Sequence, residues 1–201
     1  VPETIDGLLG SQKNLGFSSL VGSAVRLHDH SMMVGQASGA VAAVALNNDI
    51  PARAIPFDRA QLMKVQQGLT TRHANSAPTL LWPYRDLDPS NPAFTAINML
   101  TLQGCINLNA SEVFFDSKAK PTQEWMDNLV HLTSLQLKNG AATFKPPFDA
   151  SSRGEFARRW WALVKDAQWK FYTRKSSSDA DGDGIDDQDD ALPFNAANEN
   201  I

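Results

Sequence analysis

The chain has 201 residues, 42% of them hydrophobic, which is enough apolar material for one or two small globular cores. Its formal net charge of −4 comes from the last 26 residues, which hold seven Asp, one Glu and no Lys or Arg. The remainder, with 18 basic and 14 acidic residues, has no cluster of Lys and Arg, so we expect no nucleic-acid partner. The single cysteine, Cys105, excludes an internal disulfide and is expected to be a small buried residue.

The first predicted elements are a serine-rich strand and a helix, in the stretch GFSSLVGSAVRLHDHSMMVGQASGAVAAVAL. Small residues dominate the helix, so a sheet, another helix or a flat cofactor can approach its backbone closely. We expect the helix to begin between Met33 and Gln36, where free N–H groups and the helix dipole would favour negative charge. The uncharged residues from Met32 to Leu46 would span only ~22 Å, too short for a bilayer. The alternative to a helix that contacts a cofactor is a structural helix buried in a globular domain.

Together with IPFDRAQLMKVQQGL, this stretch resembles the C-terminal segment of a family of bacterial FAD-dependent oxidoreductases, over residues 5 to 69. The resemblance implies that the strand, an arginine and the small-residue helix close over a flavin, with FAD as the cofactor. The residues implied to surround the isoalloxazine ring are Arg26, Gly35, Gln36, Ala37 and Gly39. Arg26 can equally be a buried ion-pair partner.

The GxGxxG turn that holds a dinucleotide pyrophosphate is absent from the sequence. Because the chain also begins at Val1 rather than Met, we expect it to be the C-terminal part of a longer polypeptide. The upstream part of that polypeptide, or a companion chain with the dinucleotide-binding fold, would then share the FAD.

Two histidines, His28 and His30, lie just before the expected start of the small-residue helix. On an extended segment both would face the same side, where they could act as acid or base near a flavin. Solvent-facing or buried polar roles are the alternative, and a metal pair would need further ligands that we cannot identify.

Three amphipathic helices are predicted in the middle of the chain. The first begins after Asn91-Pro92 and ends at Gly104. The second begins at Thr122 and stops at Asn139-Gly140. The third begins at a capping box made by Ser152 and Glu155.

YRDLDPSNPAFTAINMLTLQGCINLNASEVFFDSKAKPTQEWMDNLV resembles a degenerate S-layer homology repeat, and ATFKPPFDASSRGEFARRWWALV repeats its last portion. The resemblance implies a cell-envelope polysaccharide as partner, and a purely structural helical appendage is the alternative. Trp160, Trp161 and Trp169 could form a carbohydrate platform, although residues at this helical spacing are more often core.

The acidic tail has oxygen ligands at the spacing of a calcium loop. Gly184 permits the sharp turn within this loop, and the run as a whole resembles a bacterial thrombospondin type 3 repeat. A disordered acidic tail is the alternative. The expected calcium ligands are Asp179, Asp181, Asp183, the carbonyl of Ile185, Asp187 and Asp190.

The predicted fold is an α/β fragment, in which a strand and the small-residue helix complete a flavoprotein domain, followed by a mainly α-helical module and an irregular calcium-binding tail. The predicted boundaries are 1–75, 80–172 and 176–201. We therefore expect the C-terminal part of an exported FAD-dependent oxidoreductase, located outside a bacterial cell or in its envelope. The alternatives are a non-catalytic calcium-binding attachment or assembly protein and a polysaccharide-acting, xanthan lyase-like enzyme.

Overall fold

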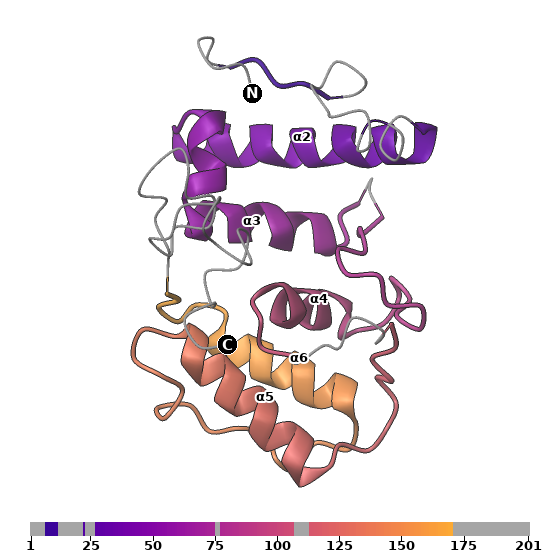
Figure 1. Cartoon of the computed structure of the whole chain (residues 1–201), viewed down its shortest axis with the longest axis vertical. Coiled ribbons are helices and arrows are strands. Elements are labelled where there is room, and N and C mark those ends of the chain that lie inside the picture. Colours follow the sequence, from indigo (N-terminus) through magenta and orange to yellow (C-terminus); the bar gives the residue numbers. More distant parts are fainter. Residues whose placement is uncertain (1–6, 12–21, 23–26, 75–76, 107–112, 171–201) are drawn as a thin grey trace. The chain divides into compact units, whose positions relative to one another are not determined.

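The computed structural model describes residues 7–11, 22, 27–74, 77–106 and 113–170 (Figure 1). It divides the chain into two compact units, with a boundary between Val65 and Gln66 inside helix α3. We call the unit before this boundary the first unit and residues Gln66–Lys170 the second unit, and we describe each by itself.

The first unit contains the long helix α2 (His28–Asn48), the 3₁₀ helix η1 (Ala52–Phe57) and the start of α3 (Arg59–Thr70). Helix α2 ends at Asp49, which takes the left-handed conformation (φ 52°), and the N–H of Ile50 then donates to the carbonyl of Ala45 at 3.1 Å. This arrangement satisfies carbonyls at the helix end, as in a Schellman motif. The chain then turns through η1, whose Ile55 is fully buried.

The second unit contains helices α4 (Phe94–Leu102), α5 (Gln123–Gln136) and α6 (Arg153–Val164), and it confirms the three predicted helices. Thr122 Oγ1 accepts a hydrogen bond from the N–H of Trp125, and Ser152 Oγ accepts one from the N–H of Glu155, both at 3.2 Å. Both bonds are typical N-caps. The capping box differs in one detail, because the Glu155 carboxylate accepts from the N–H of Ser151, at 2.9 Å, one residue earlier than the usual partner.

The core of the second unit forms mainly where α4 packs against α6. Aromatic rings extend it in edge-on contacts, with Phe115 against Trp125 and Trp125 against Phe156, at 6.0 and 5.7 Å between ring centroids. Trp160, Trp161 and Trp169 are all buried, with at most 5% of their surface exposed. They therefore belong to the core, the role favoured by their spacing, and do not form a carbohydrate platform. Cys105 is fully buried, as predicted.

Backbone hydrogen bonds join distant segments of this unit. The N–H groups of Arg153 and Gly154, at the start of α6, donate to the carbonyls of Ala119 and Ser117, both at 2.9 Å. Leu137, just after α5, and Trp169, after α6, form an isolated antiparallel bridge. Two bonds of 2.8 Å flank it, from Lys138 N to Gln168 O and from Lys170 N to Gln136 O.

The part of the chain that the structure describes is therefore mainly helical, without an assigned β-strand. The predicted serine-rich strand falls within residues 16–26, of which the structure describes only residue 22, and the calcium tail falls on residues 176–201, outside the described residues. Of the described helices, none combines the length and hydropathy needed for a membrane span.

Candidate functional site

One face of α2 is covered by the chain's own backbone. A Cβ atom added at Gly35 would lie 3.3 Å from the carbonyl oxygen of Ser11, a contact tighter than most side chains allow. One turn further on, the hydroxyl of Ser38 donates to the carbonyl of Gly10 at 2.9 Å. The expectation that something approaches this helix closely is thus confirmed at Gly35, and the partner there is backbone.

Another face of α2 is exposed along its whole length. Its residues recur at the spacing of one helical face, and we call them the exposed stripe: Met32, Gln36, Gly39, Ala43 and Leu46. Met32 and Leu46 are 67% and 83% exposed, which is unusual for large apolar side chains. A Cβ atom at Gly39 would meet nothing within 4 Å, so the backbone is open there.

The start of α2 differs from the prediction. The helix begins at His28, so the amides of Met33 to Gln36 lie inside it and bond to carbonyls four residues earlier. Gly35 lies about 10 Å along the axis from the first residue at 1.5 Å per residue. The prediction that the helix begins between Met33 and Gln36, with free N–H groups there, is therefore wrong.

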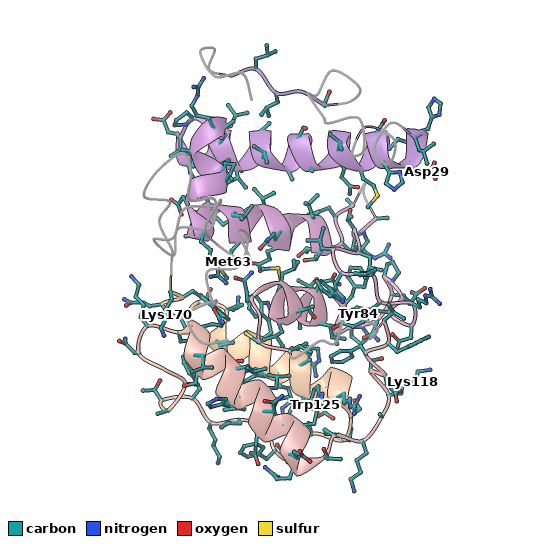
Figure 2. All side chains as sticks on the ribbon, viewed as in Figure 1. Asp29, Met63, Tyr84, Lys118, Trp125 and Lys170 are labelled. Atoms are coloured by element: carbon teal, nitrogen blue, oxygen red, sulfur yellow. The ribbon has the colours of Figure 1, made fainter. Side chains whose placement is uncertain are left out.

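The helix N-terminus lies at His28, Asp29 and His30 instead. Leu27 gives no side-chain cap, and Asp29 places a negative charge in the first turn (Figure 2). His28 and His30 are both exposed, but they are helical and so point about 200° apart. The expectation that they share one side of an extended segment is wrong. Within the described residues, no three His, Cys, Asp or Glu side chains are grouped for a metal ion.

The other predicted cofactor residues lie on more than one face of α2. Gln36 and Gly39 are exposed and belong to the stripe, whereas Gly35 and Ala37 are half-buried. Arg26 lies outside the described residues, as do all the predicted calcium ligands. The cofactor and metal assignments of these residues stay predictions.

Sequence reasoning missed the apolar part of the stripe, namely Met32, Ala43 and Leu46. Their spacing of three and four residues is visible in the sequence, but the neighbouring faces are just as uncharged. An amphipathic helix is recognised by contrast between its faces, and α2 offers almost none.

Among the described residues of α2, the exposed stripe therefore leaves the side of the helix open. Gly39 leaves room for contact with the helix backbone, and the stripe has no charge that would have to lose its water.

Comparison with known proteins bears on the same segment. The family model described as FAD dependent oxidoreductase matches residues 1–69, which include α2, η1 and nearly all of α3. Searches of curated proteins and of solved structures gave no match. The match confirms the predicted resemblance over one third of the chain, and the family named there uses FAD. Residues 1–69 are thus a segment similar to the FAD-dependent oxidoreductases.

Proposed function

We propose that the chain is the C-terminal part of an exported FAD-dependent oxidoreductase, in which α2 forms one wall of the flavin site. The family match over residues 1–69 carries this proposal, and the exposed stripe supports it. FAD, when bound, supplies transfer of a hydride or of electrons to and from the substrate. The rest of the site would come from an upstream part of the polypeptide or from a companion chain.

The roles of the predicted cofactor residues follow from where α2 places them. Gly39 would let the ring approach the helix backbone, and Gln36, one turn earlier on the stripe, would present its amide beside it. Gly35 would act indirectly, because it admits the backbone of Ser11 and so fixes the segment beside the helix. Arg26 and Ala37 complete the proposed set.

Absorption spectra of the full polypeptide test the proposal. We expect flavin bands in the purified protein, and their absence from correctly folded material would refute the oxidoreductase. Gly39→Leu should lose the flavin while helix content, measured by circular dichroism, is kept. Gly68→Leu is the matched control, because a Cβ atom at this α3 glycine also meets nothing within 4 Å. Equal flavin retention by the two variants would exclude Gly39 from the wall.

We also propose that the acidic tail binds calcium outside the cell or in its envelope. The proposal rests on the sequence spacing of Asp179, Asp181 and Asp183 with the later ligands. Extracellular calcium modules work at about 10⁻⁴–10⁻³ M, which suits such a site. Calorimetry should show calcium binding that Asp181→Ala abolishes, whereas Asp186→Ala, outside the ligand positions, keeps it. No heat above the buffer control would refute the site.

The helical module, residues 80–172, is proposed as an envelope-associated appendage with a wall polysaccharide as its partner. Arg153, which starts α6 in this module, is half-buried, and its guanidinium lies 5.3 Å from the centre of the Trp125 ring. Co-sedimentation with purified wall polysaccharide should fail for Arg153→Gln if this module binds the polymer. If the unchanged protein and Arg153→Gln both bind, Arg153 is not part of the polysaccharide site. If neither binds, the module is a structural appendage. A non-catalytic attachment protein would show polymer and calcium binding without flavin.

A further inference from the structure

The turn that follows α5 contains the only Asn-Gly pair in the sequence, Asn139-Gly140. Asn139 is exposed, and Gly140 takes a positive φ of 63°. Gly140 suits this left-handed conformation because it has no Cβ atom. The pair has no part in the function proposed above.

An asparagine followed by glycine is open to a reaction within the chain. The backbone nitrogen of Gly140 can attack Cγ of Asn139, which forms a five-membered succinimide ring and releases ammonia. Water then opens the ring at either carbonyl and leaves aspartate or isoaspartate. The reaction needs only water, and a side chain on the second residue would hinder the attack.

The attacking nitrogen takes part in a long hydrogen bond. The N–H of Gly140 donates to the carbonyl of Leu137 at 3.2 Å, the long end of the range for such bonds. The following N–H, from Ala141, is held better, at 3.0 Å from Ser134 Oγ. We propose that Asn139 is a spontaneous deamidation site in the folded protein.

The position of the turn gives this reaction a structural consequence. Lys138, next to Asn139, donates its N–H to Gln168 at 2.8 Å beside the Leu137–Trp169 bridge. Isoaspartate would add one methylene to the backbone one residue away from this bond. The isoaspartyl form should therefore pair less well with residues 168–170 and unfold more easily, whereas aspartate would only add a charge.

Peptide mapping by mass spectrometry after incubation of the whole chain at mildly alkaline pH tests the proposal. Asn139 should lose its amide, while Asn128, exposed on α5 and followed by Leu129, keeps it. The urea-unfolded chain, incubated in parallel, shows that the chemistry proceeds. Retention of the amide at Asn139 in the folded chain alone, or equal loss at Asn128, would overturn the proposal.

A second measurement tests the consequence. The isoaspartyl fraction, separated by ion exchange, should unfold at a lower urea concentration than the starting protein. Asn139→Asp carries the same charge on a normal backbone and should keep the original midpoint. Equal midpoints for the isoaspartyl fraction and Asn139→Asp would show that the added methylene leaves the bridge intact.

Discussion

Replacing Gly154 by alanine should destabilise the second unit, although alanine is the better helix former. The added Cβ atom would lie 3.0 Å from the carbonyl oxygen of Ser117, 3.3 Å from its Cβ and 3.6 Å from the Cβ of Ala93. The same carbonyl accepts the N–H of Gly154 at 2.9 Å, so it cannot retreat without lengthening that bond.

The size of the stability loss in Gly154→Ala follows from two opposed effects. Overpacking costs about 1–3 kcal/mol, and weakening one backbone hydrogen bond adds about 1 kcal/mol. Exchanging glycine for alanine inside a helix returns at most about 1 kcal/mol. We therefore expect a net loss of about 1–3 kcal/mol in the free energy of unfolding.

Urea unfolding followed by tryptophan fluorescence measures this change in the relevant unit, because all five tryptophans lie between residues 82 and 169. With a urea dependence of about 1–3 kcal/mol per molar, the midpoint should fall by roughly 1 M. An unchanged or higher midpoint would refute the tight approach of α6 to Ser117.

Gly39→Ala in α2 is the matched control for Gly154→Ala. A Cβ atom there meets nothing within 4 Å, so the substitution should stabilise α2 by about 0.5–1 kcal/mol. Far-ultraviolet circular dichroism should show this gain, and the fluorescence midpoint of the second unit should not move.

Three further outcomes are expected. The indole N–H of the buried Trp160 donates to Thr133 Oγ1 at 3.0 Å. Thr133→Val removes this acceptor and should lower the free energy of unfolding, measured in urea, by about 1–3 kcal/mol, whereas Thr133→Ser keeps the bond. The Arg159 guanidinium lies 2.9 Å from the Asp149 carboxyl and lowers its pKa. This pair therefore stabilises the fold at pH values above the ordinary carboxyl pKa, near pH 4. That contribution is lost as the pH falls through the lowered pKa, and Arg159→Met should flatten the acid limb of a stability curve measured against pH. Cys105 should react with a thiol reagent only after urea unfolds the chain, and rapid labelling of the native protein would contradict its complete burial.

The helices of the second unit could be predicted because their ends are marked by local chemistry. Thr122 and Ser152 cap α5 and α6 through bonds to residues three positions later, a signal contained within four residues of sequence. Gly104, just past α4, takes the positive φ of 71° that favours glycine after a helix. Local signals of this kind need no knowledge of the rest of the fold.

The start of α2 could not be predicted for the opposite reason. Leu27 precedes the helix without capping it, and the polar residues from His28 to Ser31 resemble a loop. Ser31 is nevertheless buried, so tertiary packing rather than a local cap sets this end. The roles of Gly35 and Gly39 were indistinguishable in sequence, since only the path of Ser11 tells which glycine is covered.

The Leu137–Trp169 bridge also determines how the module would respond to a mechanical load. A pull on the chain beyond Lys170 reaches this short antiparallel pair before it reaches any described helix. The two hydrogen bonds of the pair and the packing of the buried Trp169 ring would therefore break before the contacts of α4 and α6. We therefore expect a pull from this side to separate the bridge before it unfolds α6.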